Sequence, residues 1–118
     1  MITGIHALIY AKEAEKVRAF FGDVLGLRSV DAGNGWLIFE LPPAELGIHP
    51  DPTGGAQELY LMCDDLEATI AELEKKGVAF SGAVSEASFG RVTSIHLPGG
   101  GELRLYQPRH PTALPPRR

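Results

Sequence analysis

Hydrophobic and polar residues alternate with period two in several short stretches of the chain, and in two longer stretches the apolar residues recur at helical spacing. The alternation predicts strands over residues 4–10, 27–31, 36–41, 44–50, 57–63, 78–82, 90–97 and 102–108. The helical stretches are "EAEKVRAFFGDVLG" (13–26) and the run after Asp64 or Asp65, either of which can cap a helix that ends at Gly77. The segment "AVSEASF" (83–89) predicts a loop.

The order strand, helix, strand, strand, strand occurs twice, and the two halves match each other in sequence. "HALIYAKEAEKV" (6–17) aligns with "ELYLMCDDLEAT" (58–69), and "ELGIH" (45–49) aligns with "ELRLY" (102–106). We therefore predict one domain built from two β-α-β-β-β modules. Its parts are module one (4–50), a turn-rich linker (51–56), module two (57–108) and a flexible tail (109–118).

One face of the predicted strands is apolar and can pack under the two helices. Its residues are Ala7, Ile9, Ala11, Leu37, Phe39, Leu41, Leu46, Ile48, Leu59, Leu61, Cys63, Ile95, Leu97, Leu103 and Leu105. The opposite face holds aromatic and ionisable side chains, a mixture that is typical of small-molecule sites. It includes His6, Tyr10, Trp36, His49, Glu58, Tyr60, Glu102, Arg104 and Tyr106. We predict that this polar-aromatic face lines a cavity; the alternatives are an exposed aromatic surface or a face covered by a partner subunit.

Composition narrows the class of protein further. With 118 residues, 44% hydrophobic and 22% charged, the chain has the composition of a soluble globular domain. Its formal net charge of −4 argues against a nucleic-acid partner. The single cysteine, Cys63, cannot form an internal disulfide, and neither a signal peptide nor a run of membrane-spanning length is present, so we expect a cytoplasmic protein without a membrane partner.

The opening strand "IHALIYA", its continuation "KVRAFFGDVLGL" and the ending "LPGGGELRLYQP" resemble the glyoxalase, bleomycin-resistance and extradiol dioxygenase superfamily, also called vicinal oxygen chelate proteins. The resemblance covers residues 4–108. It implies an α+β fold in which two modules form an open, eight-stranded, mostly antiparallel, barrel-like sheet around a concave cavity, with two outer helices. Open sheet edges predict a homodimer, and the resemblance implies the same, because proteins of this superfamily are commonly dimers.

In metal-dependent proteins of this superfamily, the first and last strands of the modules supply the ligands of one divalent ion. The resemblance puts the first-strand ligands on His6 and Glu58. The last-strand ligand is usually a glutamate six residues after the proline of the turn, and here the position six residues after Pro98 is Arg104. Arginine is always protonated and cannot donate a lone pair to a cation, so the usual ligand set is incomplete.

Two accounts of this altered site remain open. The internal counterpart of Arg104 in module one is Gly47, so this ligand position is lost as well. His49 and Glu102 each lie two residues from a lost position, and they could form a displaced metal site with His6 and Glu58. Alternatively, Glu58 and Arg104 pair directly without an ion.

The favoured function is small-molecule binding of the glyoxalase/bleomycin-resistance type, which requires no cofactor. The predicted ligand-binding residues are His6, Tyr10, Trp36, His49, Glu58, Tyr60, Arg104 and Tyr106. The alternative is a divalent-metal-dependent lyase, isomerase or dioxygenase, in which His6 and Glu58 hold an ion that acts as a Lewis acid. The pattern identifies no catalytic residue and leaves enzymatic activity open.

Overall fold

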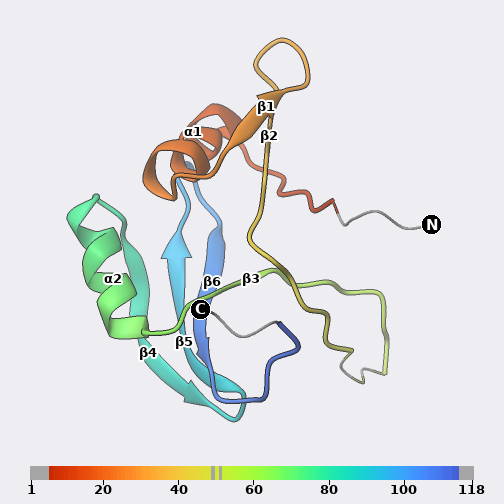
Figure 1. The fold of residues 1–118 in the computed structure, drawn as a ribbon, viewed down its shortest axis with the longest axis vertical. Coiled ribbons are helices and arrows are strands. Elements are labelled where there is room, and N and C mark those ends of the chain that lie inside the picture. Colours follow the sequence, from red (N-terminus) through yellow and green to blue (C-terminus); the bar gives the residue numbers. More distant parts are fainter. Residues whose placement is uncertain (1–5, 49, 51, 115–118) are drawn as a thin grey trace.

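The computed structural model describes residues 6–48, 50 and 52–114. The elements in chain order are α1 (Ala14–Ala19), the π-helical turn η1 (Phe20–Val24), β1 (Ser29–Asp31), β2 (Leu37–Phe39), β3 (Tyr60–Met62), α2 (Leu66–Lys75), β4 (Phe80–Ala87), β5 (Gly90–His96) and β6 (Glu102–Pro108). β1 and β2 form a two-stranded antiparallel sheet, and a four-stranded mixed sheet has the order β3-β6-β5-β4 (Figure 1). The α+β class predicted from the sequence is confirmed.

Both predicted helices form. Asp65 caps α2, because its side chain accepts a hydrogen bond from the backbone N–H of Ala68 at 3.0 Å. Leu66 and Leu73 provide the buried stripe of α2, and Gly77 ends the helix with a left-handed φ of 87°.

The first helix changes its winding partway along. After α1 the chain continues as η1, where the Leu25 N–H donates to the Phe20 carbonyl at 3.0 Å, a spacing of five residues. Val17, Phe20 and Phe21 are all buried, because residues three and four positions apart lie on one face of a helix. Gly26, with a φ of 71°, ends the helix as predicted.

The four-stranded sheet contains most of module two. β3 is parallel to β6, with Tyr60 opposite Arg104, whereas β5 is antiparallel to both β6 and β4. The predicted loop 83–89 is wrong for most of its length, because β4 continues through a bulge to Ala87. Backbone pairing with β5 extends this strand in spite of its polar composition.

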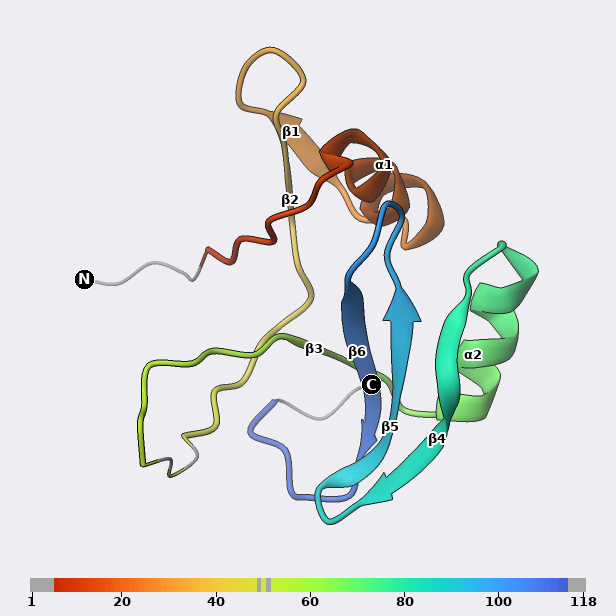
Figure 2. The same cartoon turned by 180° about the vertical axis from the view of Figure 1, so that it is seen from behind.

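The helices and the four-stranded sheet share one hydrophobic core. Figure 2 shows α2 lying beside the strands of this sheet. Its buried members are Val17, Phe20, Phe21, Leu66, Leu73, Ile95, Leu97, Leu103 and Leu105. On β6, Leu103 and Leu105 are buried in this core whereas Arg104 between them is exposed, so the predicted alternation of apolar and polar faces is confirmed on this strand.

The first half of the chain is more open. Residues 6–11 and 40–48 form no strand, so strands 4–10 and 44–50 are not confirmed over their described residues. Both views show much of the β2–β3 loop extending away from the four-stranded sheet (Figures 1 and 2). Large apolar side chains are exposed in two parts of the first half. Before α1 they are Leu8, Ile9 and Tyr10, and in the β2–β3 loop they include Leu41, Leu46 and Ile48.

The eight-stranded barrel-like arrangement is therefore not confirmed, and no closed barrel is present in the described part of the chain. Alternating sequence alone does not make a strand, because each strand needs a neighbour for its backbone hydrogen bonds. Within the ranges that the structure describes, no helix is long and apolar enough to cross a membrane.

Candidate functional site

Three aromatic rings meet on the sheet face opposite the helices. They are Tyr60 on β3, Tyr106 on β6 and Phe89 in the turn between β4 and β5. Their ring centroids lie 5.5 to 6.0 Å apart, and each pair meets edge to face. This geometry is favourable for aromatic pairs. We call these three residues the aromatic cluster.

A chain of polar contacts borders the aromatic cluster on its β3 side. The Arg104 guanidinium donates from Nη1 to the Tyr60 hydroxyl at 3.2 Å, and that hydroxyl donates to Glu58 Oε2 at 3.3 Å. The same guanidinium carbon lies 5.6 Å from the Tyr60 ring centroid, within cation–π range. The predicted direct pair of Glu58 and Arg104 is therefore not formed, and the Tyr60 hydroxyl connects the two side chains instead.

This polar chain is exposed, which limits its contribution to stability. Glu58 and Arg104 are both open to solvent, and exposed ionic contacts are each worth about 0–1 kcal/mol. The contacts fix the direction of the guanidinium, and its other N–H groups can serve a ligand.

A second polar group borders the aromatic cluster at Tyr106. The Tyr106 hydroxyl and His110 Nε2 are 3.0 Å apart, and His110 Nε2 lies 3.9 Å from Glu45 Oε1. Burial raises the pKa of the Tyr106 phenol, and the Glu45 carboxylate adds to the effect. In contrast, hydrogen bonds from the Thr112 hydroxyl and the Ala113 N–H lower the pKa of Glu45.

Three residues at this site, Phe89, Glu45 and His110, were not predicted as site residues from the sequence. Phe89 lay in a predicted loop and His110 in the predicted tail, so neither had a predicted face. Glu45 had a usable signal, because alternation along 44–50 places it on the same face as His49.

The other predicted residues do not join the aromatic cluster through any contact observed in the described part of the chain. His6 and Tyr10 are exposed on the segment before α1. The guanidinium carbon of Arg18 lies over the Trp36 ring, 5.8 Å from the ring centroid. Glu102 accepts a hydrogen bond from the Ser81 hydroxyl at 3.1 Å. His49 is outside the described residues.

Among the described residues, no group of three or more His, Cys, Asp and Glu side chains could hold a metal ion. Arg104 also places a positive charge beside Glu58, through Tyr60. A fixed cation beside a carboxylate opposes the binding of a divalent ion to that carboxylate.

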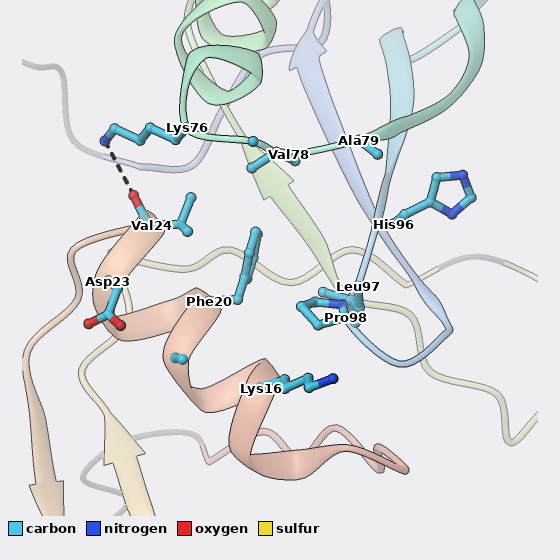
Figure 3. A pocket seen from close by; sticks show the side chains of 12 residues that line it. Lys16, Phe20, Asp23, Val24, Lys76, Val78, Ala79, His96, Leu97 and Pro98 are labelled. Atoms are coloured by element: carbon cyan, nitrogen blue, oxygen red, sulfur yellow. Dashed lines mark hydrogen bonds between the residues drawn. The ribbon is translucent and has the colours of Figure 1, made fainter.

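A separate hollow of about 390 Å³ lies between the first helix and the ends of α2 and β5. Figure 3 shows Phe20 at its centre and the Lys76 ammonium directed at the Val24 carbonyl, to which it donates at 3.3 Å. His96 lines this hollow. None of the described residues named above for the polar-aromatic face lines this hollow, so it does not coincide with the predicted site.

A helix-backed sheet whose free face carries aromatic rings and an oriented arginine defines the class: an α+β domain with a candidate small-molecule face.

No protein-family model and no curated protein matches the chain. Solved structures do match it. An antibiotic binding protein, TnmS3 of Streptomyces sp. CB03234, is 25% identical with a TM-score of 0.65, over 91% of this chain and 97% of that one.

Two further structures agree with this result. A glyoxalase/bleomycin resistance protein of the same Streptomyces strain is 26% identical with a TM-score of 0.57, over 84% of this chain and 95% of that one. A lactoylglutathione lyase of Agrobacterium tumefaciens is 15% identical with a TM-score of 0.63, over 89% and 92%. The chain therefore has the fold of the glyoxalase/bleomycin resistance protein/dioxygenase superfamily, as the sequence resemblance indicated.

Proposed function

We propose that the protein binds a small aromatic molecule that carries an anionic or hydrogen-bond-accepting group. The observation that carries the proposal is the exposed Arg104 guanidinium, held by the Tyr60 hydroxyl at the border of the aromatic cluster. An arginine in this setting can form two parallel hydrogen bonds to a carboxylate, while the neighbouring rings contact the flat part of the ligand. The similarity to an antibiotic binding protein supports this class of function.

The ligand-contacting residues proposed on this face are Glu58, Tyr60, Arg104 and Tyr106. Glu58 would accept a hydrogen bond from a ligand hydroxyl or amine, since a carboxylate has two acceptor oxygens and the Tyr60 hydroxyl donates to Oε2. The first-half residues His6, Tyr10, Trp36 and His49 stay predictions, and they would join the site only if the open first half folds over it.

We also propose that two copies of the chain form a homodimer in the cytoplasm. The first half exposes several large apolar side chains, including Tyr10 at 91% and Ile48 at 84%. The exposed set in this half is Leu8, Ile9, Tyr10, Val30, Trp36, Leu41, Leu46 and Ile48. At about 100 Å² each, these side chains would bury on the order of 800 Å² per copy, which is the area that one partner contributes to a standard interface. Sedimentation velocity at several concentrations tests this, and Ile48→Asp should shift the equilibrium toward monomer.

The experiment for ligand binding is a thermal-shift screen of aromatic antibiotics, including bleomycin, followed by calorimetry on any hit. Arg104→Met should weaken a hit by about tenfold or more, because hydrogen bonds to charged groups contribute about 1.5–3 kcal/mol. Arg28→Met is the matched control, since Arg28 is an exposed arginine paired with Glu40 at 3.3 Å, away from the aromatic cluster. Equal loss in both variants would contradict the assignment.

We propose that binding needs no metal. Metal analysis of protein purified without chelator, together with a His6→Ala variant, tests this against the alternative of a metal-dependent enzyme. Stoichiometric metal that disappears with His6→Ala would overturn the proposal. Arg104→Glu restores the usual ligand type, so we expect it to raise divalent-metal affinity relative to the unchanged chain.

A further inference from the structure

The described part of the C-terminal tail, residues 109–114, returns across the sheet face that carries the aromatic cluster. This segment first continues the antiparallel pairing of β5 with β6, because the Arg109 N–H donates to the Phe89 carbonyl at 2.9 Å. The Arg109 guanidinium also contacts Glu86 on β4 at 2.9 Å. We call residues 109–114 the strap.

Glu45 fastens the far end of the strap. Its Oε2 accepts hydrogen bonds from the Thr112 hydroxyl at 2.7 Å and from the Ala113 N–H at 2.8 Å. The Glu45 side chain is only 16% exposed, whereas its neighbour Leu46 is 79% exposed. Glu45 lies in the β2–β3 loop, so this fastening joins the two halves of the chain.

His110 lies between these two anchors and covers Tyr106. Its Nδ1 is 2.8 Å from the Pro111 carbonyl, which can only accept, so Nδ1 carries the proton. Nε2 then accepts from the Tyr106 hydroxyl in the neutral ring, and the two ring centroids are 5.9 Å apart. Tyr106 is left 9% exposed.

We infer that the strap is a reversible cover of the aromatic cluster, held closed by Glu45 and occupying with His110 the side of Tyr106 that a ligand would contact. This inference rests on the proposed function. A ligand that reaches Tyr106 must displace the His110 ring, because the other sides of Tyr106 already contact Tyr60 and Phe89. Closure of the strap and ligand binding at Tyr106 therefore compete.

Closure is tested without any ligand, by amide hydrogen exchange at Ala113 in the full chain. Glu45→Gln keeps the shape of the side chain but removes its charge, so exchange at Ala113 should become about tenfold faster. Glu40→Gln is the matched control, since Glu40 is an exposed carboxylate paired with Arg28. Unchanged exchange in Glu45→Gln would overturn the cover.

Competition is tested with an anionic aromatic dye, 8-anilinonaphthalene-1-sulfonate. Glu45→Gln and His110→Ala should each bind the dye several-fold more tightly than the unchanged chain, with no change in Glu40→Gln. Faster exchange with unchanged or absent dye binding would mean that the strap opens without exposing a site, which overturns the inference. If the opened variants gain affinity but Arg104→Met has no effect on it, the cover stands and the proposed role of Arg104 fails.

Discussion

Gly90 sits where a single methyl group should measurably destabilise the sheet and displace the aromatic cluster. It is the first residue of β5 and has a φ of 154°, a conformation that side chains rarely adopt. A Cβ at this position would lie 3.1 Å from the Gln107 carbonyl carbon and from Pro108 Cα, and closer still to the Gln107 oxygen. Those atoms belong to β6, so they cannot move without disturbing the β5–β6 pairing.

The expected cost of Gly90→Ala has two parts. The unfavourable backbone conformation contributes about 1–3 kcal/mol, and the steric overlap adds about 1–3 kcal/mol. Gly100→Ala isolates the first part, because Gly100 has a φ of 113° but no atom within 4 Å of its added Cβ. Gly90→Ala should therefore lower the free energy of unfolding by about 1–3 kcal/mol more than Gly100→Ala does.

Urea denaturation followed by far-UV circular dichroism measures both variants. With a slope of about 1–3 kcal/mol per molar urea for a small domain, the two midpoints should differ by roughly 1 M. Phe89 precedes Gly90 and its carbonyl accepts from Arg109, so Gly90→Ala should also loosen the aromatic cluster and the strap. Equal midpoints for the two variants would refute the close approach of Gly90 to β6.

Four further outcomes follow from single contacts. Asp65→Ala removes the cap of α2 and should cost about 0.5–2 kcal/mol in the same denaturation assay. Ile95→Ala creates a cavity at a fully buried position and should cost about 2–5 kcal/mol. Burial raises the pKa of the Cys63 thiol, so iodoacetamide should alkylate it more slowly at pH 8 than it alkylates free cysteine. The Glu45 pKa is lowered from 4.5, so its stabilisation of the strap is complete above pH 4.5 and is lost only as the pH falls through the lowered value, which NMR of the strap amides can follow.

The second half of the fold was largely predictable from local sequence. Asp65 and Gly77 mark the ends of α2, and the alternation of Leu103, Arg104 and Leu105 gives the buried and exposed faces of β6. The polar end of β4 was not predictable in this way, because pairing with β5 determines its conformation and a loop is equally compatible with its composition.

The first half carries the same alternation, but its described residues form only the β1–β2 hairpin as a sheet. Val30 pairs with Ile38 across the turn, where Asp31 accepts a hydrogen bond from the Gly33 N–H at 2.7 Å. Local contacts of this kind can be inferred from sequence. Which strand pairs with a strand-like segment such as 44–48 depends on long-range contacts, and the alternation does not specify that partner.

The candidate site shows the same division between local and long-range information. Tyr60 and Arg104 were selected from their faces, and the parallel register of β3 and β6 places them opposite each other. The part played by the Tyr60 hydroxyl, which lies between Arg104 and Glu58, required the side-chain geometry. His110 was outside any predicted element, so only the folded path of the strap brings it to Tyr106.

The predicted internal repeat compares the two halves residue by residue at the candidate site. In the aligned segments, the counterparts of Tyr60 and Arg104 are Leu8 and Gly47. A first-half sheet with the register of β3 and β6 would therefore place a leucine opposite a glycine, which offers neither a hydroxyl nor a cation. Such a sheet could supply apolar wall to a ligand, whereas orientation of its polar group would depend on Arg104. In that closed arrangement, substitutions at Leu8 should alter affinity through packing, and those at Arg104 should alter which polar groups are accepted.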